Sequence, residues 1–472
     1  MPPTLEELRL RHGDRYKWLV LLTVMIGSMA SIMSSTIVNV AIPDLSRHFT
    51  LGQERAQWVS AAFMLAMTLS MLTTPWLLLR FGLRGTYTGA ILMLLAGGVA
   101  GGFSVDYPML LSMRVVEGLA SGILQPIPAI VILRAFDTRE QGKAMGIFGF
   151  GVVLAPAVGP SIGGFLVEYF GWRSIFFVVV PFCLCVLVLI RRYLAKNSMA
   201  SGQVSPLDWK GLLLAGFSSI CILNGLVHLH GDLPVAAALL GTGLCSLIGF
   251  VAYQLRVEEP LMNMKLFGYR QFAMGALVAF IYGMGLFAST YLLPVYMQMG
   301  LHYLPSQAGL VLLPAGIMLA ITIWMAGKLV NRFAPHVLVS IGLALLALSC
   351  ALMALGTPGT SYVTLMAWAV VGRIGLGLVL PSLSLGSMRG VDVALIAQGV
   401  SAINFLRQLG GAIGVSLVGI VLEWRLAAHA PAAAAPVARN SLAAFDETFL
   451  FIATTCVIAV LAAWRMRARR AA

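Results

Sequence analysis

The sequence predicts an all-α integral membrane protein, and three observations carry this prediction. Hydrophobic residues make up 59% of the 472 residues, and charged residues make up only 10%. A soluble chain has about 25% charged residues, so these are too few to cover a water-exposed surface. Apolar runs recur along the whole chain, each long enough to cross a bilayer as a helix. The same composition excludes intrinsic disorder, which needs low hydrophobicity and many charges.

Long apolar runs predict fourteen transmembrane helices. In chain order they cover residues 18–42, 57–79, 85–104, 107–133, 144–169, 174–190, 211–229, 234–255, 272–298, 306–330, 337–355, 362–386, 395–422 and 448–464. The run 18–42 is too long for the apolar region of a signal peptide and lacks a small-residue cleavage site. We therefore expect it to remain as the first helix.

The distribution of Lys and Arg predicts that both termini lie in the cytoplasm. With the N-terminus inside, the cytoplasmic segments hold 23 of the 31 basic residues, the opposite loops hold 5, and 3 lie inside helices. Cytoplasmic loops are the ones that carry such an excess. Membrane topology therefore explains the net charge of +13, and we expect no nucleic-acid partner.

Two echoes along the chain predict two bundles of six helices. An L-x-x-R-F pattern contains Arg80 in one loop and Arg332 in another, and Arg114 and Arg373 are each followed by glycines and a proline. Parallel repeats of six helices are a common plan of transporters. We expect an interfacial N-terminal segment at 1–17, an N-terminal bundle at 18–190, a linker with two extra helices at 191–271, a C-terminal bundle at 272–466 and a basic tail at 467–472.

Four ionisable side chains lie deep in predicted helices, namely Arg114, Glu117, Arg373 and Arg407. Such groups cost about 2.5–3.5 kcal/mol at the centre of a span, so we expect them to face the interior and to function. Glu117 is the only deep carboxylate, and its i, i+3 spacing places it on one helix face with Arg114. Burial disfavours the charged carboxylate and Arg114 favours it, so the balance responds to conformation and substrate. We predict that Glu117 carries a coupling proton; the alternative is that it only neutralises Arg114.

The deep charges also bear on the substrate. Three arginines against one carboxylate leave an excess of two positive charges, which favours an anionic or amphipathic acid over a lipophilic cation. The alternative is that Arg373, Arg407 or both bind backbone carbonyls at helix breaks. We place the substrate cavity among Ser34, Asn39, Tyr291, Arg373 and Arg407.

Several motifs carry a resemblance to a known family. The helix at 144–169 contains LAPAVGPSIGG at 154–164, the helix at 107–133 contains MRVVEG at 113–118, and STIVNVAIP and RQLGG begin at Ser35 and Arg407. The first is similar to an antiporter signature, and the second resembles the RxxQG motif. Together they resemble the major facilitator superfamily, specifically its fourteen-helix drug:proton antiporters of the EmrB/QacA type. The chain departs from that pattern at Ser34 and Leu79, where Asp is expected, at Pro75 for Gly, and at Glu117 for Gln.

The resemblance implies alternating access between two bundles in a bacterial inner (plasma) membrane, with the proton gradient as energy source and no cofactor. It implies a conformational motif of Pro156, Gly159, Pro160, Gly163 and Gly164. It implies a gating loop with Arg80, Gly82, Arg84 and Arg332. The expected partners are an amphipathic small molecule and membrane lipid; some relatives also use a periplasmic adaptor protein, and an adaptor remains open here.

The predicted function is therefore secondary active transport and not enzymatic catalysis. We expect proton-coupled efflux of amphipathic drugs or organic compounds, and hence antibiotic resistance. The alternatives are an uncoupled uniporter or lipid-type flippase on the same fold, and a non-transporting membrane sensor or scaffold. The sequence has no Walker, HExxH or GxSxG motif, and its six cysteines lie in apolar runs without a CxxC pair. We therefore expect neither a nucleotide site nor a metal site.

Overall fold

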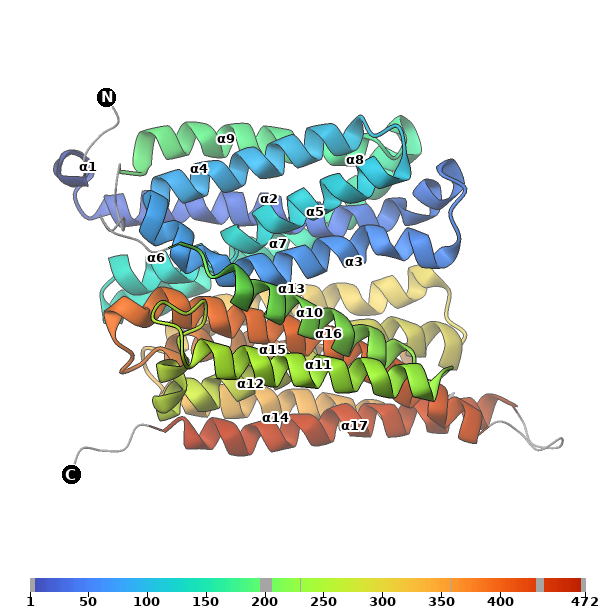
Figure 1. Cartoon of the computed structure of the whole chain (residues 1–472). Coiled ribbons are helices and arrows are strands. Elements are labelled where there is room, and N and C mark those ends of the chain that lie inside the picture. The colour runs from blue at the N-terminus through green and yellow to red at the C-terminus, as the bar shows by residue number, and fades with distance from the viewer. Residues whose placement is uncertain (1–4, 196–205, 230, 358, 430–436, 468–472) are drawn as a thin grey trace. The chain divides into compact units, whose positions relative to one another are not determined.

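Helices account for all the regular structure of the described chain (Figure 1). A computed structural model describes residues 5–195, 206–229, 231–357, 359–429 and 437–467. Contacts between Cα atoms divide the chain into two units. Unit 1 comprises Met1–Asp208 and Val393–Phe405, and unit 2 comprises Trp209–Asp392 and Leu406–Ala472. In lipid a helix satisfies its own backbone hydrogen bonds, which explains why the apolar runs take this form.

Unit 1 is a bundle of long helices with short helical connections. Its elements are α1 (Leu5–His12), α2 (Arg15–His48), α3 (Gln53–Ser70), η1 (Met71–Thr73), α4 (Thr74–Gly102), α5 (Tyr107–Leu124), α6 (Ile127–Ala135), α7 (Thr138–Phe170), α8 (Ser174–Phe177) and α9 (Val179–Tyr193). Helix α5 packs against both α3 and α4, while α2 packs against α7 and α9. These contacts place α5 next to α2, α3 and α4, where its ionisable side chains lie.

Unit 2 holds the remaining helices. Its elements are α10 (Trp209–Val227), α11 (Leu233–Gln254), η2 (Met264–Gly268), α12 (Arg270–Val295), a π-helical turn η3 (Tyr296–Gly300), α13 (Pro305–Leu329), α14 (Pro335–Met353), α15 (Tyr362–Ser387) and α17 (Val437–Arg465). The turn η4 (Val393–Leu395) and the first part of α16 (Ile396–Ala428) belong to unit 1, and α16 continues in unit 2. Helices α10 and α11, which we expected in a separate linker, pack against each other and are grouped with unit 2.

The two units share one pattern of helix packing. In unit 1 the pairs α3–α5, α4–α5, α2–α5, α2–α9 and α4–α9 are in contact. In unit 2 the pairs α13–α15, α14–α15, α12–α15, α12–α17 and α14–α17 are in contact. Helix α5 of unit 1 therefore has its structural counterpart in α15 of unit 2, and α2 has its counterpart in α12.

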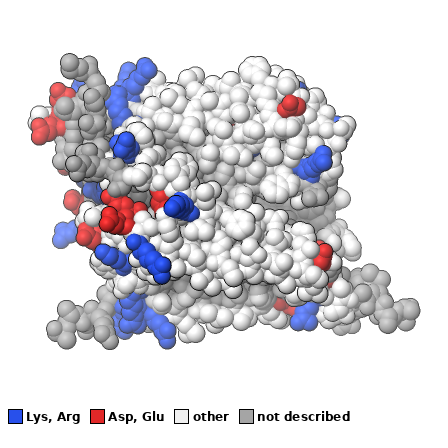
Figure 2. Space-filling view, in the orientation of Figure 1, with Lys and Arg blue, Asp and Glu red and all other residues white. Residues whose placement is uncertain are grey.

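Twelve segments of the described residues are long and apolar enough to cross a membrane, as judged from length and composition. One of them, Arg55–Gly102, has 48 residues and turns at Gly82, where φ is 68° and ψ is 174°. On the face drawn in Figure 2, most charged side chains gather near the ends of the helices, and the surface between them is largely uncharged. This distribution fits a protein whose middle lies in hydrocarbon.

The helices extend beyond the apolar runs at several ends. Helix α2, the first predicted span, continues through Pro43 to His48, whereas we expected that span to end at Ile42. Helix α16 ends at Ala428, beyond the apolar run that ends at residue 422. Helix α17 begins at Val437, before the apolar run that begins at residue 448. Arg425 and Glu447, 2.8 Å apart, pair across these two polar extensions. Apolar composition marks the part of a helix inside hydrocarbon, and the helix itself continues into the polar region.

Candidate coupling and substrate site

Helix α5 carries the most deeply buried charges of unit 1. The Asp106 side chain caps its start by accepting from the Met109 N–H at 2.8 Å. Further along, Gly118 and Gly122 face α3 so closely that a Cβ atom at either would overlap the backbone of Phe63 or Met67. Only glycine permits this approach, and it holds the preceding turn of α5 against α3.

Arg114 and Glu117 form an ion pair within that turn. The Arg114 Nη1 atom lies 2.5 Å from Glu117 Oε2, and the two side chains are 0% and 1% exposed. Their i, i+3 spacing places both on one helix face, as the sequence predicts. Buried charges are tolerated when they are paired and hydrogen-bonded, so each of these side chains depends on the other.

The Arg114 guanidinium also connects α5 with two neighbouring helices. Its Nε donates to the Val59 carbonyl on α3 at 3.2 Å, and its Nη1 lies 3.4 Å from both the carbonyl and the hydroxyl of Ser34 on α2. Its Cζ lies 4.2 Å from the ring centre of Phe63. Among the described residues no group accepts from its Nη2, which is buried.

Two glycines of α4 make room for the carboxylate. A Cβ atom at Gly97 would lie 2.7 Å from Glu117 Cγ, and one at Gly98 would lie 3.4 Å from Glu117 Oε1. The Ser34 hydroxyl and the carboxylate share the Arg114 Nη1 atom as neighbour. Glu117 therefore lies between α2 and α4. Gly97, Gly98, Val59 and Phe63 were not predicted as site residues, because nothing in one sequence tells which helices touch.

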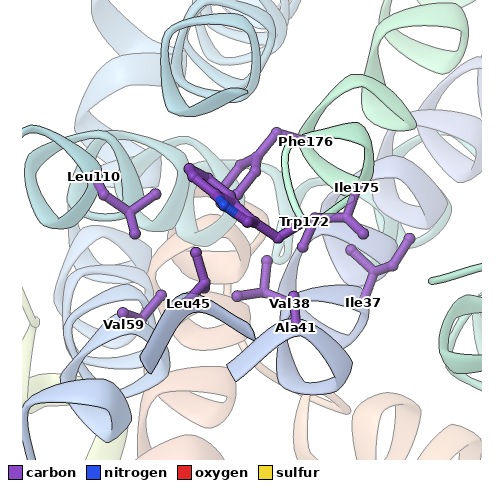
Figure 3. Packing of buried hydrophobic residues seen from close by; sticks show 9 residues of the cluster. All are labelled: Ile37, Val38, Ala41, Leu45, Val59, Leu110, Trp172, Ile175 and Phe176. Atoms are coloured by element: carbon purple, nitrogen blue, oxygen red, sulfur yellow. The ribbon is translucent and has the colours of Figure 1, made fainter. Parts of the chain in front are cut away.

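Figure 3 shows a cluster of buried apolar side chains in unit 1. It consists of Ile37, Val38, Ala41, Leu45, Val59, Leu110, Trp172, Ile175 and Phe176. Val59 belongs to this cluster and also binds Arg114 through its carbonyl, and Leu110 precedes Arg114 by one helical turn. The cluster thus excludes water from one side of the ion pair.

The predicted conformational motif lies on α7 and packs against α2. A Cβ atom at Gly159 would lie 2.9 Å from Thr36 Oγ1, and one at Gly163 would lie 2.6 Å from Ile37 Cγ1. At Gly164 the nearest atom, Val40 Cγ1, is 3.9 Å away. Two of the three glycines therefore set a close contact of α7 with α2. The side chains of the predicted residues Pro156 and Pro160 lie outside the described ones.

The predicted gating residues lie at the turn inside α4 and at the end of α13. Gly82 is buried and adopts the positive φ that makes the turn, while Arg84 donates to the Leu194 carbonyl at 3.2 Å. Arg80 and Arg332 are both exposed.

In unit 2, hydrogen bonds of Arg373 and Tyr282 join α12 with α15. Arg373 on α15 donates to the Thr290 hydroxyl on α12 at 3.2 Å. Tyr282 on α12 is 2% exposed and donates to the Leu376 carbonyl at 3.2 Å. Arg407 lies on α16 and is partly exposed. A cavity of about 10 Å³ beside Arg373 has room for one water molecule and is too small for an organic substrate.

The remaining predicted cavity residues lie nearer the surface of their own units. Asn39 is exposed and accepts from the Ser60 hydroxyl at 2.8 Å, and Tyr291 is 41% exposed. Among the described residues, no group of three or more His, Cys, Asp or Glu side chains is arranged to bind a metal.

Comparison with known proteins identifies the family. Residues 24–415 match the sequence profile of the Major Facilitator Superfamily. The chain belongs to this superfamily. Its members are transporters and not enzymes, so the chain is a membrane transporter.

Several members of the superfamily are similar to this chain over most of its length. The uncharacterized MFS-type transporter YhcA of Bacillus subtilis (strain 168) is 29% identical over 415 residues, covering 87% of this chain and 77% of the relative. The multidrug resistance protein B homolog of Mycobacterium tuberculosis (strain ATCC 25618 / H37Rv) is 29% identical over 430 residues, covering 88% and 78%. The solved structure of the proton:xylose symporter XylE has a TM-score of 0.70 at 12% identity and covers 96% of each chain, which confirms the fold.

Proposed function

We propose that the protein is a proton-coupled efflux transporter of amphipathic compounds and that Glu117 carries the proton. The observation that carries this proposal is the fully buried ion pair of Glu117 with Arg114. Ionisable groups inside a membrane span are costly and are retained at ion and substrate pathways. Efflux of drugs is supported by the multidrug resistance protein B homolog, to which the chain is similar over most of its length.

Protonation of Glu117 changes what holds Arg114. When the carboxylate is charged, it holds the guanidinium on α5; when it is protonated, the guanidinium interacts more with its other acceptors on α2 and α3. One proton therefore shifts Arg114 between partners on different helices. Antiport follows if the substrate-bound state keeps this ion pair closed and the proton-bound state opens it.

We also propose that the chain crosses the bacterial inner membrane fourteen times, with both termini in the cytoplasm. Two observations support two spans in addition to the twelve candidate segments. Arg55–Gly102 is about twice the length of one span and turns at Gly82, and α7 adds 33 helical residues. The excess of Lys and Arg on one side supports the orientation. Alternating access would then move the two six-helix bundles, with the α2–α7 contact and the Gly82 turn as conformational elements.

The energy source in this proposal is the proton gradient, without a further cofactor, and the partners are the substrate and membrane lipid. Uptake of a fluorescent amphipathic dye into inverted vesicles tests the proposal, with and without an imposed pH gradient. Gradient-driven uptake should occur in the wild type and in the Glu168→Gln control, whose carboxylate lies near the end of α7. It should fall at least tenfold in Glu117→Gln. Full gradient-driven uptake by Glu117→Gln would remove Glu117 from the mechanism, and uptake that ignores the gradient in the wild type would favour a uniporter.

A further inference from the structure

The two sides of the Glu117–Arg114 ion pair differ in polarity. Leu110 precedes Arg114 by one helical turn on α5, and Leu45 follows Ser34 on α2. Both leucines belong to the apolar cluster of Figure 3, so going back along α5 and going forward along α2 lead to the same side of the pair. Going forward along α5 and back along α2 therefore leads to the opposite side.

The opposite side carries buried hydroxyl groups. Ser121 stands four residues after Glu117 on α5 and is 0% exposed. Ser31 stands three residues before Ser34 on α2 and is 4% exposed. A spacing of three or four residues keeps side chains on one face of a helix, so each serine continues the face that meets Arg114. Since α2 and α5 are in contact, both hydroxyls lie about one turn, roughly 5 Å along the helices, beyond the ion pair.

The Ser121 hydroxyl stands out because it has no hydrogen-bond partner among the described residues, although its oxygen is buried. A serine inside a helix commonly donates to the carbonyl of its own preceding turn, as Ser28 does to Val24 on α2. A buried hydroxyl without a partner is unfavourable, and a bound water molecule is the usual way to satisfy it. Ser121 is thus suited to hold a water molecule one turn from the Glu117 carboxylate.

Further hydroxyls continue in the same direction. Ser28 stands one turn before Ser31 on α2 and is 4% exposed. Its hydroxyl donates to the Val24 carbonyl at 2.9 Å, and the hydroxyl of Tyr87 on α4 donates to the same carbonyl at 2.9 Å. The buried polar groups therefore extend from the ion pair toward the end at which α2 begins, which is the cytoplasmic end in the proposed topology.

We propose that Ser121 and Ser31 form a path by which the coupling proton leaves Glu117 toward the cytoplasm. This inference rests on the proposed function and adds the route of the proton. The protonated carboxyl group gives its proton to a water molecule held by Ser121, and the carboxylate that remains pairs with Arg114. Water and the Ser31 hydroxyl then pass a proton on toward Ser28. Each of these groups accepts one proton and donates one, so no charge stays on the path.

The spacing of the hydroxyls decides how the proton moves. Groups one turn apart are separated by more than a hydrogen bond, whose heavy atoms lie about 2.6–3.2 Å apart, so each step needs one bridging water molecule. The apolar cluster on the other side of the pair keeps this path from running through to the opposite face of the membrane. A proton that enters from that face therefore has to wait for a conformational change.

The test separates proton movement from substrate movement in inverted vesicles. Gradient-driven uptake of the fluorescent amphipathic dye requires Glu117 to release its proton, whereas exchange of dye across the membrane at equal pH does not. Ser31→Ala/Ser121→Ala should lower gradient-driven uptake at least fivefold and keep exchange within twofold of the wild type. Ser121→Thr retains a hydroxyl and should keep at least half of the uptake. Ser112→Ala removes an exposed hydroxyl near the start of α5 and should behave as the wild type.

A solvent isotope effect gives a second readout that a packing role would not change. If the path is impaired, proton transfer becomes the slow step of transport. The ratio of the uptake rates in H2O and D2O should therefore be at least twofold larger in Ser121→Ala than in the wild type, and unchanged in Ser112→Ala.

Three outcomes decide between the path and its alternatives. Wild-type uptake by Ser31→Ala/Ser121→Ala would overturn the path, and so would equal losses of uptake and exchange, which would assign the two serines to packing. Loss of uptake in Glu117→Gln alone would overturn the path and leave the proposed function standing. Full gradient-driven uptake by Glu117→Gln would overturn the proposed function itself.

Discussion

The Nη1 atom of Arg114 on α5 lies 3.4 Å from the hydroxyl of Ser34 on α2 and 2.5 Å from the Glu117 carboxylate. Ser34 stands where the resemblance to drug:proton antiporters leads one to expect an aspartate. The position of that aspartate and the position of Glu117 thus both meet one nitrogen of Arg114. This relationship explains how a carboxylate on α5 can take the place of one on α2, and it makes the exchange testable.

Moving the carboxylate from position 117 on α5 to position 34 on α2 should restore proton coupling. An aspartate at position 34 would reach Arg114 from α2, because the serine hydroxyl is already within hydrogen-bonding distance. We expect Ser34→Asp/Glu117→Gln to recover at least a third of the gradient-driven dye transport that Glu117→Gln loses. Transport assays in inverted vesicles measure this recovery. Ser34→Asn/Glu117→Gln, which has the size without the charge, should recover none, and equal recovery by both would show that charge at position 34 is irrelevant.

Removing one partner of the buried pair should destabilise the protein more than removing both. Arg114→Gln leaves a buried carboxylate without its counter-charge, and breaking such a pair costs about 3–5 kcal/mol. Arg114→Gln/Glu117→Gln leaves two neutral amides and should regain much of the loss. Thermal unfolding in detergent, followed by size-exclusion chromatography, ranks the variants. A double variant that unfolds at or below the temperature of both single variants would contradict the interaction.

The contact of α7 with α2 should tolerate a methyl group at Gly164 and not at Gly163. A Cβ atom at Gly163 would meet Ile37, which is buried in the apolar cluster, and overpacking of this kind costs about 1–3 kcal/mol. At Gly164 the nearest atom is at ordinary contact distance. We expect Gly163→Ala to lower both the unfolding temperature and transport, Gly159→Leu to abolish transport, and Gly164→Ala to behave as the wild type. Equal effects at 163 and 164 would mean that the close contact does not matter.

The turn inside α4 should require glycine at position 82. Its φ of 68° with ψ of 174° falls in a region that is essentially restricted to glycine, so a side chain there costs about 1–3 kcal/mol. Gly89 on the same helix has open space around its Cα and ordinary helical φ, which makes Gly89→Ala a matched control that should be neutral or stabilising. Thermal unfolding of the two alanine variants measures the difference, and a Gly82→Ala variant as stable as Gly89→Ala would refute the strain.

The sequence predicts the helices and the family well and the site only in part. Apolar runs locate each long helix because hydrocarbon demands continuous apolar surface, although the polar extensions of α16 and α17 escape this criterion. The i, i+3 pairing of Arg114 with Glu117 follows from helix geometry alone. Contacts between helices do not, because periodicity tells which face of a helix is apolar and not which neighbour covers it.

Unit 2 illustrates that limit most clearly. Depth in predicted helices marks Arg373 and Arg407 as candidate substrate-binding residues, with carbonyl binding as the alternative. The structure gives Arg373 a hydroxyl partner, Thr290 on α12. A sequence offers one signal: the residue one turn after Arg114 is Glu117, whereas the residue one turn after Arg373 is Leu376. Interpreting this difference requires the shared packing of the two units.

The most direct measurement of the central claim is proton release on ligand binding. Purified protein in lightly buffered detergent is mixed with the amphipathic dye that it transports, and a pH indicator counts the protons released per bound dye. The account predicts release by the wild type and by Glu168→Gln, and no release by Glu117→Gln although it still binds the dye. Release by Glu117→Gln equal to that of the wild type would contradict the claim that Glu117 carries the coupling proton.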